Sequence, residues 1–273
     1  MANISDFKSS PFNFMQQGTS TTDGTGVVDA GIAREVGTRF MLDDGREVAL
    51  VSNGAAALVA GNLLQSEAEV TAFHKLAMTV PSAYPASIGQ NQILVTNGAT
   101  VLNVNKFQGG YASVTAGTGI GQSFRIASHA EAAANATFVV TIEETIAVAL
   151  DTSSKITLMQ NLYKNVIQTP ITTATGATVG ISLYPVAAAV ASTYNATTGK
   201  LTTAGVDQYA FIGVRGMFNV LVDSTVTNVG YPIGCSKTTA GTVGVATLTT
   251  VPQIGVSAQT LTSAETGMVY ISL

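Results

Sequence analysis

The feature that most constrains the fold is a series of short apolar runs that recur about every ten residues. The runs are rich in β-branched or aromatic residues and are bounded by Gly, Asn, Pro or Ser. This pattern is typical of short strands in an antiparallel sandwich or barrel. We therefore predict a mainly β fold with a hairpin at 38–51 and strands at 93–104, 112–114, 122–126, 137–142, 155–158, 179–183, 209–214, 217–222, 241–248 and 268–273.

Turn signals and alanine-rich pieces refine this prediction. The Asp-Asp-Gly at 43–45 lies between two alternating runs and predicts the turn of the hairpin, and 194–203 has the pattern of a polar hairpin tip. The alanine-rich pieces 65–78 and 130–135 could be short helices, and 187–191 could be helix or strand. We therefore expect an antiparallel β-sandwich or barrel with one or two short helices.

The first thirty-five residues differ from the rest of the chain. They lack a periodic apolar pattern and include the polar stretch GTSTTDGTG at 18–26, which is typical of an extended or flexible arm. Residues 1–75 carry 14 of the 28 charged side chains, whereas 152–273 carry only eight. We divide the chain into an arm at 1–35, a β-rich domain at 36–130 and a low-charge β-rich domain at 131–273.

Charge and cysteine usage exclude several classes of protein. The net charge is −4 and no run of Lys or Arg occurs, so nucleic acid and anionic membranes are not expected partners. A single cysteine, Cys235, excludes an internal disulfide framework and a multi-cysteine metal site. The N-terminus lacks the apolar core of a signal peptide, which predicts synthesis in a cytoplasm.

Candidate catalytic groups are few. The chain has two histidines, His74 and His129, and neither lies in a nucleophile motif. Adjacent carboxylates occur at 43–44 and 143–144, but neighbouring residues on a strand point to opposite faces and cannot flank one bond. The acidic turn at 43–47 also lacks the oxygen spacing of a calcium loop. We expect no enzymatic activity, no cofactor and no metal.

The glycine-rich segment 117–121 (GTGIG) superficially resembles a phosphate-binding loop. Such a loop opens a helix whose N-terminal amides hold the phosphate. Here the following residues, 122–126, have the pattern of a strand, so we interpret the segment as a turn between strands.

Several stretches, in chain order, carry a family resemblance. They are 37–50 (GTRFMLDDGREVAL) with 57–61 (ALVAG), 109–111 (GGY) with 119–126 (GIGQSFRI), 141–150 (TIEETIAVAL) with 154–158 (SKITL) and 161–163 (NLY), 209–216 (YAFIGVRG), and 254–258 (IGVSA) with 265–273 (ETGMVYISL). Together they resemble the head decoration, or cement, proteins of tailed bacteriophages. The chain departs from that pattern at Phe211 and Gly213, where the family has Trp and Gln.

The resemblance implies a β-rich symmetric oligomer, often a trimer, that contacts the major capsid protein on the outside of the phage head. It implies a structural virion protein without enzymatic activity, which stabilises the mature capsid. Two alternatives stay open, namely a shell-forming major capsid protein and a tail or fibre adhesin.

Five residues are candidates for partner contact. Phe12 and Phe14 alternate and would share one face of an added strand, with Met15 on the other face, so they could anchor the arm on a neighbour. Glu143 and Arg215 are candidate lattice contacts. Phe211 is expected to pack in the core of its own domain.

Overall fold

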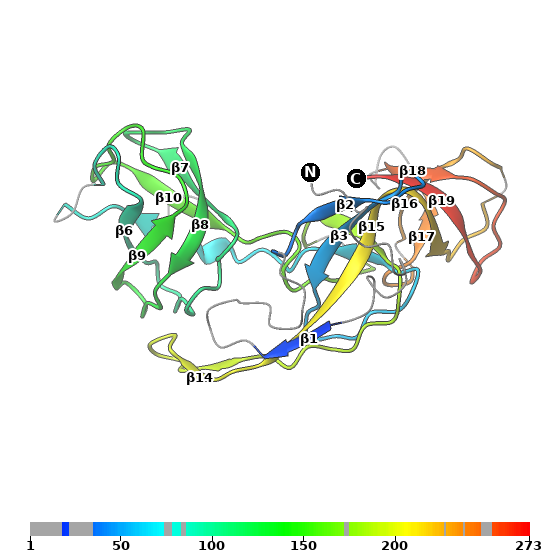
Figure 1. The fold of residues 1–273 in the computed structure, drawn as a ribbon, viewed down its shortest axis with the longest axis horizontal. Coiled ribbons are helices and arrows are strands. Elements are labelled where there is room, and N and C mark those ends of the chain that lie inside the picture. The colour runs from blue at the N-terminus through cyan, green and yellow to red at the C-terminus, as the bar shows by residue number, and fades with distance from the viewer. Residues whose placement is uncertain are drawn as a thin grey trace.

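A computed structural model describes residues 18–21, 35–73, 78–82, 86–171, 175–226, 228–236, 238–246 and 253–273. The chain forms two lobes of antiparallel strands, a closed six-stranded barrel and a large sheet (Figure 1). The predicted mainly β, antiparallel fold is confirmed.

The barrel lobe is filled by its own side chains. Its strands alternate between buried and exposed residues, so that every second side chain points inward. The inward residues Ile93, Val114, Ile126, Val140 and Leu158 are almost completely buried in one continuous core. The strands close in the order β10-β5-β6-β9-β8-β7, with bounds β5 (Met78–Thr79), β6 (Gln92–Thr96), β7 (Tyr111–Ala116), β8 (Ser123–His129), β9 (Thr137–Ile142) and β10 (Lys155–Met159).

The glycine-rich segment 117–121 is the turn between β7 and β8. Gly117, Gly119 and Gly121 all have positive φ, a conformation that glycine adopts without steric cost. A Cβ atom on Gly117 would lie 2.0 Å from the carbonyl oxygen of Ser153, so the close approach to the next loop also requires glycine.

The sheet lobe contains the other strands. They form an 11-stranded sheet, with a separate two-stranded ribbon made by β13 and β14. Their bounds are β1 (Gly18–Thr21), β2 (Arg39–Met41), β3 (Glu47–Ser52), β4 (Leu63–Gln65), β11 (Ile167–Gln168), β12 (Thr178–Ser182), β13 (Thr193–Tyr194), β14 (Leu201–Thr203), β15 (Val206–Leu221), β16 (Pro232–Cys235), β17 (Val243–Val245), β18 (Gln253–Ser257) and β19 (Thr266–Ser272).

The long strand β15 organises this lobe. It pairs with β3 along its middle, with β12 at two residues, with β19 along its C-terminal half and with β1 at its start. The sequence analysis predicted two strands here, separated near Arg215. Instead, the register shifts between Gly213 and Arg215, and Gly216 has φ +112°. The irregularity acts as a β-bulge, which lets one strand continue through the glycines.

Both faces of the sheet are covered where β3 and β15 pair. Val48 and Leu50 belong to one hydrophobic core, whereas the intervening Ala49 and Val51 belong to the other. Because side chains alternate along a strand, the two cores lie on opposite faces of the same sheet. Phe211 lies in the first core and meets Phe40 edge to face at a centroid distance of 5.5 Å.

Neither of the two segments 65–78 and 130–135 forms an α-helix in its described residues. In segment 65–78, the only helical piece among the described residues is a 3-10 turn, η2 (Thr71–Phe73). Segment 130–135 contains an isolated bridge from Ala132 to Leu102 and a turn at 134–135, where Asn135 has φ +59°. It is not helical because so short a piece cannot offset the cost of helix nucleation. The expected division at residue 130 falls between β8 and β9, which pair with each other in the barrel.

The barrel is an insertion between β4 and β11 of the sheet lobe. The chain crosses between the lobes twice, as the two connecting segments in Figure 1 show. The β13–β14 hairpin makes a further contact, because the amide of Val104 in the barrel donates to the carbonyl of Gly199 at the hairpin tip (3.3 Å). The orientation of the barrel is therefore set by contacts at these crossings and at the hairpin tip.

Candidate functional site

The structure places the predicted partner contacts in different parts of the molecule. Glu143 follows β9 at the barrel and lies 3.6 Å from the Nε atom of Arg125. Arg215, on β15, donates to the carboxylate of Glu47 at 3.2 Å. The two residues are thus on separate lobes and do not form one site. The three arm residues Phe12, Phe14 and Met15 lie outside the described residues, as does His74.

The Glu143–Glu144 pair corrects one step of the sequence analysis. The two residues lie in a bend after β9 rather than within a strand, so their side chains are not forced to opposite faces. Glu144 accepts a hydrogen bond from the amide of Arg125 (2.7 Å), and Glu143 pairs with the guanidinium of the same residue. Both carboxylates are held by one arginine, which is a structural arrangement.

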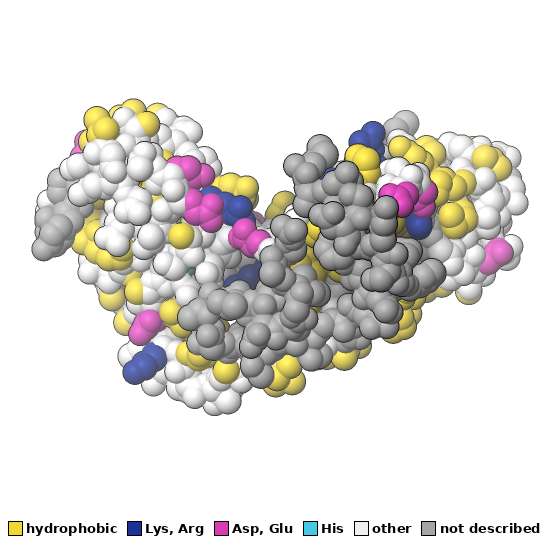
Figure 2. Space-filling model, in the orientation of Figure 1, with side chains coloured by type: hydrophobic (Ala, Val, Ile, Leu, Met, Phe, Trp, Pro, Cys, Tyr) yellow, Lys and Arg dark blue, Asp and Glu magenta, His cyan; other side chains and the backbone are white. Residues whose placement is uncertain are grey.

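A groove separates the two lobes at this arginine. It has a volume of about 490 Å³ and is lined by both lobes, and Figure 2 shows the surface hollowed between them. Arg125 of the barrel forms an ion pair with Glu35 across the groove. The exposed side chains of Tyr111, Met159 and Leu162 give the groove apolar walls.

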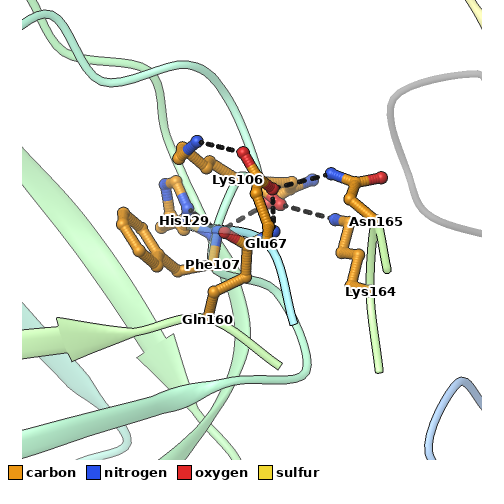
Figure 3. Close-up of polar contacts among 8 residues, drawn as sticks. Glu67, Lys106, Phe107, His129, Gln160, Lys164 and Asn165 are labelled. Carbon is orange, nitrogen blue, oxygen red and sulfur yellow. Dashed lines mark hydrogen bonds and ion pairs between the residues drawn. The ribbon is translucent and has the colours of Figure 1, made fainter. Parts of the chain in front are cut away.

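A polar cluster lies where the chain crosses between the lobes. The Glu67 carboxylate accepts hydrogen bonds from Gln160 (2.6 Å) and Asn165 (3.0 Å) and pairs with Lys106 (3.5 Å). Figure 3 shows the carboxylate of Glu67 between Lys106 and Asn165. Burial by itself would raise the pKa of Glu67, but the Lys106 ammonium and the amide hydrogen bonds outweigh it and lower the pKa. Glu67 is therefore a charged link between the first crossing (66–73) and the second crossing (159–165). We call Glu67 and its partners Lys106, Gln160 and Asn165 the latch.

Lys164 extends this cluster toward β15. Its ammonium donates to the carbonyl of Asn105 (3.3 Å). Burial lowers the pKa of Lys164, and the carboxylates of Asp207 and Glu67 oppose that effect. Burial has the opposite effect on a carboxylate and raises the pKa of Asp207. Asp207 also accepts a hydrogen bond from the Tyr209 hydroxyl (3.2 Å). The start of β15 is thus linked electrostatically to the junction of the lobes.

His129 has a structural role in the barrel. Its Nε2 atom accepts a hydrogen bond from the amide of Phe107 (2.9 Å), which places the proton on Nδ1, where it faces the carbonyl of Ala130 (2.9 Å). Burial lowers the pKa of His129 to about 4. The ring is neutral and its two nitrogens are engaged by the backbone, so it has no free nitrogen for general base chemistry.

An apolar strand face is the most distinctive surface feature of the sheet lobe. We use this name for Met217, Pro232, Val256, Met268 and Tyr270. The register pairs Met217 with Tyr270, Tyr270 with Val256, and Val256 with Pro232. Directly paired residues share one face of a sheet, so the row crosses four strands, from β15 through β19 and β18 to β16.

This face lies opposite the first hydrophobic core, with Met268 and Tyr270 exposed and Met217, Pro232 and Val256 half-buried. Along β19 the buried Val269 and Ile271 alternate with Met268 (36% exposed) and Tyr270 (41% exposed). In Figure 2, hydrophobic side chains gather over the part of the lobe where Figure 1 places β18 and β19. Arg215 lies at the margin, where the Tyr270 hydroxyl and the Glu47 carboxylate raise its pKa.

Among the described residues, no group of three or more His, Cys, Asp or Glu side chains is placed to hold a metal ion. The helical part of the described chain contains no segment with the length and apolarity needed to cross a membrane.

Comparison of the chain with protein-family models, with curated proteins and with solved structures gives no match.

Neither the latch nor the apolar strand face is predicted by the sequence patterns. Glu67 meets residues 39, 93 and 98 positions away, and no local motif connects them. The β-branched and aromatic residues at 268–273 did predict a strand. Their pattern could have indicated an apolar outer face as well, because Met268 and Tyr270 occupy the positions between the buried residues.

Replacing Glu67 by Gln is expected to loosen the junction of the lobes. Gln160 and Asn165 both donate to Oε2 of Glu67, whereas Lys106 pairs with Oε1. The neutral amide loses the ion pair and places either its NH2 group or an uncharged oxygen beside the Lys106 ammonium, at an expected cost of about 1–3 kcal/mol. Hydrogen exchange of the crossings, 66–73 and 159–165, should speed up while the barrel strands stay protected. Glu131→Gln, a substitution elsewhere in the barrel lobe, is the control. Unchanged exchange at both crossings in Glu67→Gln would remove the latch role.

Proposed function

We propose that this chain is a non-enzymatic structural protein of a phage virion, which binds the outer surface of the head and stabilises the mature capsid. The proposed partners are the major capsid protein and further copies of the chain, arranged as a symmetric oligomer such as a trimer. The family resemblance in the sequence motivates the proposal, and the surface of the sheet lobe supports it.

The observation that carries the proposal is the apolar strand face. It presents two methionines and a tyrosine on a rigid sheet, and apolar and aromatic residues of this kind are enriched at the centres of protein interfaces. The segment 152–273, which provides all five of its residues, carries only eight charged side chains. A low-charge, sheet-borne surface suits attachment to a protein lattice better than attachment to nucleic acid.

The ionisable groups of the described chain support a structural role. Glu67 is held by the side chains of Lys106, Gln160 and Asn165. Glu143 and Glu144 are held by the side chain and the amide of Arg125, and His129 is neutral inside the barrel. These contacts tie neighbouring segments of the protein to one another, as structural side chains do. We therefore propose no catalytic activity.

Stabilisation would follow from mass action. A protein that binds the expanded lattice but not its precursor lowers the free energy of the expanded state, and many equivalent sites on one head multiply the effect. Purified protein mixed with expanded, undecorated heads is expected to saturate them at a fixed ratio and to raise their melting temperature. If the protein does not bind heads, the tail or fibre adhesin alternative is favoured. If it assembles shells by itself, the major capsid protein alternative is favoured.

The apolar strand face gives this proposal a sharper test. The double substitution Met217→Thr with Tyr270→Thr keeps strand propensity and removes the central apolar contacts. Its apparent affinity for heads is expected to fall by tenfold or more, as it does when an interface anchor is truncated. Mass photometry of protein and heads measures the occupancy.

The control is Ile120→Thr, which removes an exposed apolar side chain (67% exposed) at the glycine turn of the barrel. Its binding should match that of the unmodified chain. Full binding by the double variant, with an unchanged melting temperature, would show that the apolar strand face does not contact the head.

A further inference from the structure

The start of β15 presents backbone hydrogen-bonding groups on two sides. On one side, the carbonyl of Gln208 accepts from Asn53, and Val206 exchanges two hydrogen bonds with Val190. The amide and carbonyl of one residue point to the same side of an antiparallel strand, and successive residues alternate. The backbone groups of Asp207 and Tyr209 therefore face the other side, where they form an edge to which another strand can add.

β1 occupies that position. Its four residues pair with β15 in the register Gly18–Tyr209, Thr19–Gln208, Ser20–Asp207 and Thr21–Val206. Its sequence, Gly-Thr-Ser-Thr, contains no apolar residue, so the pairing rests on main-chain hydrogen bonds. Strand addition of this kind takes its affinity from the backbone, and β1 of a second copy would make the same bonds.

The chain between β1 and the rest of the protein is long enough to reach a neighbour. Thirteen residues, 22–34, separate Thr21 from Glu35, and thirteen extended residues span about 45 Å. A compact protein of 273 residues has a radius of gyration of about 19 Å. The arm can therefore extend beyond its own molecule to an adjacent one.

We propose that β1 is exchanged between copies of this chain, so that β1 of one molecule adds to the start of β15 in another. Pairing within one chain is favoured in dilute solution because the arm keeps β1 at high effective concentration. Pairing between chains takes over where copies are crowded, with the same contacts in both states. This inference does not depend on a phage head as the partner.

Cross-linking between two differently tagged chains tests the exchange. In a Cys235→Ala background, one chain carries Thr21→Cys and the other carries Val206→Cys. These positions are paired in the register as a non-hydrogen-bonded pair, a backbone arrangement that accepts a disulfide between two introduced cysteines. After mixing and mild oxidation, we expect a disulfide-linked heterodimer whose yield rises with protein concentration, identified by non-reducing electrophoresis and peptide mass spectrometry.

The control mixture replaces Val206→Cys by Val229→Cys, an exposed position (64% exposed) outside the β15 edge. A heterodimer yield no greater than in this control would overturn the proposal. So would a chain carrying both Thr21→Cys and Val206→Cys that is linked only within itself at every protein concentration.

A proline pair supplies a second readout within β1. Ser20 faces Asp207 in a hydrogen-bonded pair, so Ser20→Pro removes a donor to β15, whereas the amide of Thr19 points away from β15. Introduced into the Thr21→Cys chain, Ser20→Pro is expected to lower the heterodimer yield several-fold, and Thr19→Pro much less. An equal fall in both variants would contradict exchange through the β15 edge.

Discussion

Replacing Phe211 by alanine is expected to lower the free energy of unfolding of the sheet lobe by about 3–5 kcal/mol. The side chain is 1% exposed, packs edge to face on Phe40, and lies on the central strand β15. Its removal leaves a cavity beside a strand that holds four others in place, and the surrounding sheet cannot collapse to fill it.

The loss should be confined to one lobe. The barrel core shares no residue with the core around Phe211, so hydrogen exchange should rise in β3, β15 and β19 while the barrel amides stay protected. Lobe-resolved exchange is the appropriate measurement, because two lobes with separate cores need not unfold in one step.

Tyr111→Ala is the matched control for Phe211→Ala, since it removes an aromatic ring that is 52% exposed. Its free energy of unfolding should change by no more than about 0.5 kcal/mol, as for an ordinary surface substitution. A loss below about 1 kcal/mol in Phe211→Ala would contradict the central packing of this residue.

Acidification is expected to destabilise the barrel through His129. The pKa of this buried histidine is about 4 in the folded state, against 6.5 for the unperturbed side chain. Below pH 6.5 the unfolded chain therefore binds a proton that the folded barrel does not. Stability is fully present above pH 6.5, falls as the pH drops and reaches its full loss, about 3 kcal/mol, below pH 4.

The comparison of His129 with His129→Gln isolates this contribution. The glutamine variant cannot titrate, so its stability curve should be flatter between pH 6.5 and 4, although it starts lower because the hydrogen bonds of the ring to Phe107 and Ala130 are disturbed. Carboxylates titrate in both proteins and cancel in the difference. Parallel curves for the two proteins would show that His129 is not held neutral by burial.

The sequence predicted local structure well where the turn chemistry is explicit. The turn at 43–45 joins β2 and β3, and the hairpin tip at 194–203 joins β13 and β14. The interpretation of 117–121 as a turn between strands agrees with its place between β7 and β8. In each segment, a glycine with positive φ marks the turn, which is a property of a few adjacent residues and can be recognised without tertiary information.

The candidate site was harder to predict from the sequence. Arg215 was selected from the sequence, and it lies at the margin of the apolar strand face. The latch around Glu67 was not found, because its partners Lys106, Gln160 and Asn165 meet only after the barrel has closed. Single apolar residues on the outside of a strand are common, so only their alignment across four strands distinguishes this face.

The sequence by itself determined the β-rich class, the antiparallel hairpins and the low-charge character of the C-terminal half, because period-two patterning, turn residues and composition are local properties. Tertiary structure decided which strands close into the barrel, that the barrel is inserted between β4 and β11, and that β15 runs unbroken through its glycines. These features depend on hydrogen bonds between strands far apart in the chain, and a strand's own residues specify its faces but not its neighbours.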